Sequence, residues 1–192
     1  MDDEANAAFD RIEGRIAPEA FKGMWRSFSE ALVNSVQHAY IEPRGTAGSR
    51  MRSKRWWMLT QELEGELTVM VCDLGIGIPR SLPLKWEESV VAQLISKFDS
   101  SKGPDVKAIR TALEISKTRT QEAHRGKGLP QIWQAVREVS GRGVSIFSNR
   151  ARLTWNGATD KEHEFEYSDS IKGTIVAWSV KTIDGDNNDH VY

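Results

Sequence analysis

A predicted strand in the middle of the chain ends in a carboxylate that two glycines follow. The strand-forming run at residues 67–72 leads directly into Asp73-Leu-Gly75-Ile-Gly77-Ile78. Glycine has no Cβ and tolerates positive φ, so glycines at this spacing let a planar or phosphorylated group approach the main chain. The Asp73 carboxylate can accept a hydrogen bond from an exocyclic amine. The pattern also arises by chance, and its meaning depends on the residues that accompany it.

The composition is that of a globular chain and excludes several classes of protein. With 192 residues, 39% hydrophobic and 28% charged, the chain is long enough for one domain with a substantial core. A net charge of −1 argues against a globally basic nucleic-acid binder. No apolar run reaches the length of a membrane span, and the acidic first residues are unlike a secretory signal. The single Cys72 fits a reducing compartment, so we expect a cytoplasmic protein.

Hydrophobic periodicity predicts helices and strands mixed along the chain. Helices are expected over residues 4–15, 18–40, 86–98 and 105–116 and from 130 onward; strands are expected over 56–63, 67–72, 144–147, 151–155 and 174–180, with a weaker one at 164–167. Because the later strands are consecutive, we predict an α/β sandwich with a mixed, largely antiparallel sheet. Residues 1–183 are expected to form one domain, and residues 184–192 a frayed tail.

The long predicted helix carries an apolar stripe and a polar stripe. The residues expected to face the core are Trp25, Phe28, Leu32, Val36 and Ala39. Glu30, Asn34 and His38 stand at i, i+4 and i+8, so they share one face, which we expect to lie opposite Leu32 and Val36. Solvent exposure is one explanation of such a stripe. The other is a site in which an amide oxygen binds Mg²⁺ and a carboxylate one turn away acts as a base near a phosphate.

A second glycine cluster precedes the helix that is predicted from Pro130. It reads His124-Arg125-Gly126-Lys127-Gly128-Leu129. Backbone amides at a glycine-rich helix start bind phosphate, and the two basic side chains add positive charge there. The alternative is a flexible basic loop. The sequence patterns of P-loop, Rossmann and zinc sites do not occur in this chain.

Taken in order, four motifs resemble those of the GHKL ATPases, the superfamily of gyrase, MutL, heat-shock chaperone ATPases, histidine kinases and anti-sigma-factor serine kinases. The motifs are Glu30-x-x-x-Asn34-x-x-x-His38-Ala39, Asp73-x-Gly75-x-Gly77-Ile78, Gly126-x-Gly128-Leu129 and Gly173-Thr174. They look like the N box, the two glycine boxes and the terminal Gly-Thr of that superfamily. The resemblance spans about residues 20–181, and it implies a Bergerat fold with ATP bound between the long helix and a lid at about residues 79–128.

The resemblance also implies a role for each motif. Asp73 would hold the adenine amine, with Thr174 assisting through a water molecule. Gly75, Gly77 and the adjacent Ile78 would let adenine and the lid approach the backbone.

At the phosphate end, Asn34 would bind Mg²⁺ and Glu30 would act as general base. Gly126, Lys127, Gly128 and Leu129, with Arg125 beside them, would wrap the phosphates. His38 matches a position where several members place a contact on the phosphate side.

Three functions remain open at this level. The first is a stand-alone Mg-ATPase whose lid switches a protein partner or a homodimer. The second is a kinase that phosphorylates Ser or His on a partner; the first twenty residues are too few for the helical hairpin of a self-sufficient histidine kinase. The third is a nucleotide-gated binding module without turnover, against which Glu30 argues. A contact surface is expected at the basic segment 44–55 and at Trp56-Trp57.

Overall fold

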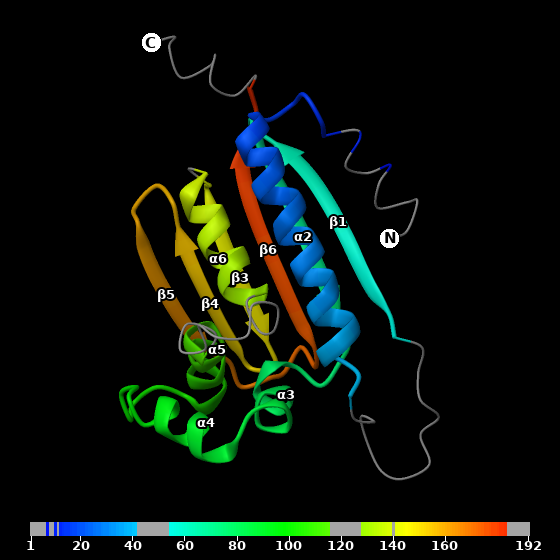
Figure 1. Cartoon of the computed structure of the whole chain (residues 1–192). Coiled ribbons are helices and arrows are strands. Elements are labelled where there is room, and N and C mark those ends of the chain that lie inside the picture. Colours follow the sequence, from blue (N-terminus) through cyan, green and yellow to red (C-terminus); the bar gives the residue numbers. More distant parts are fainter. Residues whose placement is uncertain are drawn as a thin grey trace.

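The structure is a computed structural model that describes Ala7, Asp10 and residues 12–41, 54–115, 128–139 and 141–183. In this part of the chain, helices lie on one side of a six-stranded sheet (Figure 1). The helices are α2 (Pro18–His38), α3 (Ile78–Lys85), α4 (Glu88–Ile95), α5 (Pro104–Ile115) and α6 (Gly128–Glu138). The strands are β1 (Trp56–Leu63), β2 (Glu66–Asp73), β3 (Gly143–Ser148), β4 (Ala151–Asn156), β5 (Lys161–Glu166) and β6 (Thr174–Lys181).

The sheet has the strand order β1-β2-β6-β3-β4-β5, and each pair of neighbours in the described chain is antiparallel. The α/β class is as predicted, but the expectation of a mixed sheet is wrong. The physical reason is the position of β6. β2 and β3 run in the same direction, but β6 lies between them and pairs antiparallel with both, so they never meet. The strands predicted at 56–63 and 67–72 form a hairpin that turns at Glu64 and Gly65, which both have positive φ.

The core lies between the sheet and the helices α2, α5 and α6. Alternate residues of β2, β3 and β4 are buried, as the pleat of a sheet with one covered face requires. Phe28 of α2, Ile109 of α5 and Ile132 of α6 are all fully buried in the same cluster. Trp56 packs against this cluster, whereas the adjacent Trp57 is 41% exposed, as alternation along a strand predicts.

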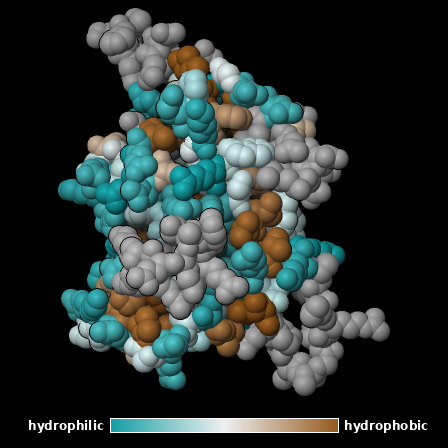
Figure 2. Space-filling model, viewed as in Figure 1, coloured by the Kyte–Doolittle hydropathy of each residue, from teal (hydrophilic) through white to brown (hydrophobic). Residues whose placement is uncertain are grey.

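The buried face of α2 differs from the predicted one. Its buried residues are Ala20, Met24, Ser27, Phe28, Ala31 and Ser35. Leu32 only flanks the core, and Val36 is 40% exposed, so its assignment to the core is wrong. Figure 2 shows the corresponding apolar surface over the C-terminal half of α2. Because the small Ala31 and Ser35 face the sheet, the stripe of Asn34 and His38 lies beside the core face and not opposite it.

Helices α3, α4 and α5 occupy the described part of the segment where a lid was expected. They share a second apolar cluster that includes Leu82, Val91, Leu94 and Ile115. Helices α4 and α5 were predicted, but α3, which contains two prolines, was not. Pro79 stands in the first turn, where its missing N–H costs nothing, and Pro83 removes a single helical hydrogen bond.

Strand β5 is bound to α5 and α6 through charges. Its Glu162 and Glu164 both contact Arg110 of α5, with nitrogen–oxygen distances of 2.5 Å. Lys102 contacts Glu164 at 2.5 Å, and Arg137 of α6 contacts Glu162 at 2.8 Å. These carboxylates replace apolar residues on the covered face, which is why the sequence indicates only a short strand here.

Several predicted elements fall on residues that the structure does not describe. These are half of the residues of the helix at 4–15, the basic residues 44–53 and the tail at 184–192. No helix in the described ranges is both long and apolar enough to cross a membrane.

Candidate functional site

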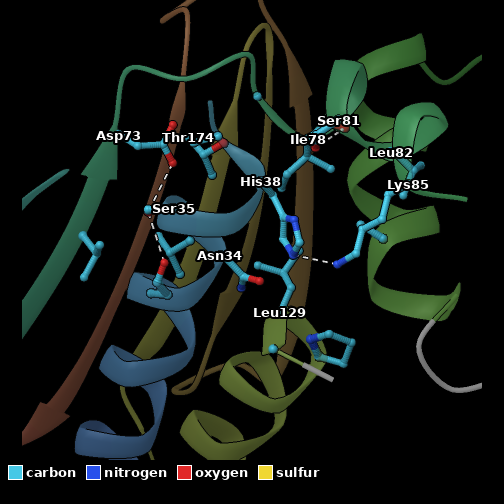
Figure 3. A pocket seen from close by; sticks show the side chains of 18 of the residues that line it. Asn34, Ser35, His38, Asp73, Ile78, Ser81, Leu82, Lys85, Leu129 and Thr174 are labelled. Carbon is cyan, nitrogen blue, oxygen red and sulfur yellow. Dashed lines mark hydrogen bonds between the residues drawn. The ribbon is translucent and has the colours of Figure 1, made fainter. Parts of the chain in front are cut away.

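A pocket opens between the C-terminal half of α2, the ends of β2 and β6, and the helices α3, α5 and α6 (Figure 3). Its cavity volume is about 110 Å³, far above the roughly 10–15 Å³ that one water molecule needs. Eight of the predicted site residues line it: Asn34, His38, Asp73, Gly77, Ile78, Gly128, Leu129 and Thr174. Side chains such as Val71, Val176 and Leu82 make much of the remaining wall apolar.

Asp73 lies at one side of this pocket and is only 6% exposed. Its Oδ1 accepts a hydrogen bond of 2.8 Å from the Gly75 N–H, and its Oδ2 accepts one of 3.3 Å from the Ser35 hydroxyl. These donors stabilise a carboxylate in a buried position. Burial raises the pKa of the neighbouring Cys72 thiol, and the Asp73 carboxylate raises it further. A buried acceptor at the wall of an apolar pocket suits a ligand that carries an amine.

Thr174 faces Asp73 across the β2–β6 pair, in register with it. Its hydroxyl lies 3.1 Å from the hydroxyl of Ser148, which also accepts a hydrogen bond of 2.8 Å from the Ile78 N–H. Ser148 is fully buried, and these two contacts of its hydroxyl connect the start of α3 to Thr174 in the pocket wall. Ser148 is not among the predicted site residues, because only the β3–β6 register places it opposite Thr174.

The glycines of the first cluster have contacts within the chain that require them. A Cβ on Gly75 would lie 2.2 Å from the carbonyl oxygen of Ala39, at the end of α2. Gly77 has a φ of +78°, and a Cβ there would lie 2.6 Å from Oδ1 of Asn149. Gly75 does not line the pocket. The backbone that it approaches closely is that of Ala39 at the end of α2.

Glu30 and Asn34 lie against the start of α6. A Cβ on Gly128 would stand 2.8 Å from Nδ2 of Asn34 and 3.0 Å from Oε2 of Glu30, so a larger residue there would displace these two side chains. Oriented to satisfy its neighbours, the Gln131 amide donates to Glu30 at 3.0 Å and accepts from Arg26 at 3.3 Å. Glu30 is half-buried, one turn before Asn34, and does not itself line the pocket.

His38 meets a lysine that the sequence analysis did not select. Lys85, the last residue of α3, places its Nζ 2.6 Å from Nε2 of His38 (Figure 3). Burial, and secondly the charge of Lys85, lower the pKa of His38 to about 4. His38 is therefore neutral near pH 7, and its Nε2 accepts a hydrogen bond from the lysine ammonium.

Part of the predicted site lies outside the described residues. Arg125, Gly126 and Lys127 belong to this part, so their assigned roles stay predictions. In the described ranges, no three His, Cys, Asp or Glu side chains are grouped so that they could hold a metal ion. The assignment of Asn34 to Mg²⁺ therefore also stays a prediction, and it needs oxygens from the ligand to complete the coordination.

The pocket also contains residues that are not among the predicted site residues. Examples are Ser35, Ser81, Lys85, Trp86, Ala112 and Ile115. Ser35 is the one with a signal in the sequence, since it lies next to Asn34 and one helical turn after Ala31. The whole arrangement, an apolar cleft with a carboxylate on one side and a lysine on the other, fits a ligand with a planar amine-bearing ring and an anionic group. No protein-family model matches this chain, and no curated protein matches it at a significant level.

Proposed function

We propose that residues 1–183 form a GHKL-type ATP-binding domain of Bergerat fold, which binds and hydrolyses Mg-ATP as a switch on a partner protein. The observation that carries the proposal is the meeting of distant motifs at one pocket. Asn34, Asp73, Gly128 and Thr174 lie far apart in the sequence, yet all four line the same cavity. Unrelated surface motifs have no reason to converge in this way.

The adenine base would occupy the apolar part of the pocket beside Asp73. Its exocyclic amine would donate to the Asp73 carboxylate, which the Ser35 hydroxyl and the Gly75 N–H already hold in place. Thr174, opposite Asp73, would bind the ring through a water molecule. Because a carboxylate is only an acceptor, this side of the pocket favours a base with a donor at that position.

The phosphates would extend from there toward Asn34 and the start of α6. The Asn34 amide oxygen would bind Mg²⁺, which neutralises charge on the phosphates when it is bound. The backbone at Gly128 and Leu129 opens α6, and the positive end of a helix favours phosphate. Arg125, Gly126 and Lys127 precede this helix in the chain and would contact the same groups.

Glu30 would act as the general base. Its carboxylate would accept a proton from a water molecule as the water oxygen attacks the γ-phosphorus and ADP leaves. Gln131, whose amide oxygen accepts from Arg26, donates to this carboxylate and would orient it. The part of the chain at about 79–128 would close over the nucleotide, and this movement would carry the signal to the partner or to a second copy.

The test begins with calorimetric titration of Mg-ATP into the wild-type chain and into Asp73→Asn. The wild type should bind, and the variant should bind at least about tenfold more weakly, because Asn presents donors as well as an acceptor at the amine site. Asp169→Asn, an exposed position away from the pocket, is the matched control. If the wild type binds no nucleotide, the proposal is wrong.

Incubation with γ-labelled ATP then separates the forms of the activity. Release of free labelled phosphate supports hydrolysis, and transfer of label to a protein supports a kinase. Binding without either outcome identifies a nucleotide-gated module.

A further inference from the structure

We propose that Lys85, a residue outside all four motifs, binds the phosphate chain of the nucleotide, and that His38 positions its ammonium group. This inference rests on the proposed function and adds to it the source of a positive charge. Between Asn34 and His38 the chain reads Ser35-Val36-Gln37, with no basic residue. A charge must come from elsewhere.

The structure brings Lys85 into the pocket from a different helix. Among the described residues that line the pocket, Lys85 is the only lysine or arginine. It ends α3, and its Nζ lies 2.6 Å from Nε2 of His38 on α2. In Figure 3, Lys85 and Asp73 lie on opposite sides of the pocket, with His38 between them. A nucleotide whose base is bound at Asp73 therefore extends its phosphates toward the Lys85 side.

The protonation of the pair explains how His38 acts. Two charged groups at this distance would repel each other, and a neutral imidazole avoids this. The pKa of His38, lowered to about 4 by burial and by Lys85, keeps the ring neutral and an acceptor at ordinary pH. An ammonium group has three N–H donors and a full charge, so it can donate to His38 and to a phosphate oxygen at the same time. His38 is thus a positioning residue, and Lys85 makes the contact.

This contact would also connect the nucleotide to α3. The first N–H of the helix, that of Ile78, already donates to Ser148 beside Thr174. Lys85 is the last residue of the same helix. Phosphate binding at Lys85 would hold the second end of α3, while a nucleoside without phosphates would leave this end as it is. The helix that opens the expected lid would then respond to the phosphates and not to the base.

The decisive experiment compares Mg-ATP with adenosine by calorimetry, in wild type, Lys85→Met and the control Lys97→Met. Lys97 is exposed and does not line the pocket. We expect Lys85→Met to weaken Mg-ATP binding about tenfold or more, the effect of one lost charge-assisted hydrogen bond, and to leave adenosine within about twofold. Lys97→Met should change neither.

Equal weakening of both ligands by Lys85→Met, or no weakening of either, overturns the inference while the proposed function stands. If wild type binds neither ligand, both fall together. His38→Gln keeps an acceptor and should retain most of the ATP affinity, whereas His38→Leu should lose it selectively; equal loss in the two variants contradicts the positioning role.

A measurement on the wild type alone guards against a variant that fails to fold. Amide hydrogen exchange in residues 78–85 should slow with Mg-ATP by clearly more than with saturating adenosine. Equal protection by the two ligands would show that the phosphates do not reach α3, and the inference would be wrong.

Discussion

Gly75 and the carbonyl group of Ala39 lie so close that a single methyl group on Gly75 would come within 2.2 Å of the Ala39 oxygen. The adjacent Ile76 N–H donates a hydrogen bond of 2.8 Å to the same oxygen. The strand end at Asp73 and the end of α2 are therefore joined through backbone. A glycine that a motif search assigns to ligand approach has a packing role in the chain itself.

Gly75→Ala should consequently destabilise the protein in the absence of any ligand. Backbone cannot move as a flexible side chain can, so we expect a loss of about 1–3 kcal/mol or more in the free energy of unfolding. Urea denaturation measures it. Gly23→Ala is the matched control, since its Cβ would meet a Val139 methyl at 3.3 Å and a helical alanine is favourable. Similar stabilities of the two variants would refute the packing role.

Glu30→Gln should keep Mg-ATP affinity within a few-fold and reduce hydrolysis by at least about a hundredfold, as expected for loss of a general base. The amide retains the shape of the side chain and a partner for Gln131. Calorimetry measures the binding, and release of labelled phosphate measures the turnover. Normal hydrolysis by Glu30→Gln would remove Glu30 from the mechanism. Glu138→Gln, on the exposed side of α6, controls for a change of charge alone.

His38 should make stability depend on pH in a defined range. Its pKa in the folded chain is about 4, below the ordinary 6.5, so the unfolded chain binds the proton more readily. The stability that neutral His38 contributes is present above about pH 6.5 and is lost as the pH falls toward 4. His38→Gln should flatten the dependence of the unfolding midpoint on pH in this range.

Lys85→Met should raise the pKa of His38 from its wild-type value of about 4, although burial, the larger cause of the shift, remains. NMR titration of the His38 ring follows this directly. Lys97→Met should leave the titration unchanged. A His38 pKa that is identical in Lys85→Met and wild type would show that the two side chains do not interact in solution.

Arg110→Met should loosen β5 from α5. Burial by itself raises the pKa of Glu164. Hydrogen bonds from Lys102 and Arg110 outweigh this effect and hold the pKa below its usual range. Loss of Arg110 leaves two partly buried carboxylates with fewer donors, at a cost of about 1–3 kcal/mol. Chemical denaturation measures this loss, and Arg142→Met is a control outside the cluster. The deficit should shrink as the pH falls through the range where Glu164 protonates.

The sequence predicts local elements of this fold well. The helix expected at 18–40 is observed as Pro18–His38, and the strands expected at 56–63 and 67–72 are observed as Trp56–Leu63 and Glu66–Asp73. Both depend on periodicity and turn chemistry, which neighbouring residues determine. The motifs likewise predict residues that do meet at a pocket, such as Asn34 and Asp73.

What the sequence does not predict depends on contacts between distant segments. Ser35 is buried and Val36 is exposed because of the rotation of α2 about its own axis as it lies on the sheet. Helical periodicity does not determine this rotation. Lys85 has no motif around it, and its place in the pocket depends on α3, a helix with two prolines. β5 is covered by ion pairs, so its sequence lacks the apolar alternation of a strand.

The position of β6 has a consequence for how the molecule is made. The last strand of the described residues lies between β2 and β3, and it also brings Thr174 to the pocket. Until it is synthesised, the β1–β2 hairpin and the three-stranded β3–β4–β5 unit have no strand to join them, and each has an open edge. During translation the core and the ligand pocket are therefore completed by the same late event, because β6 supplies Val176 and Trp178 to the one and Thr174 to the other.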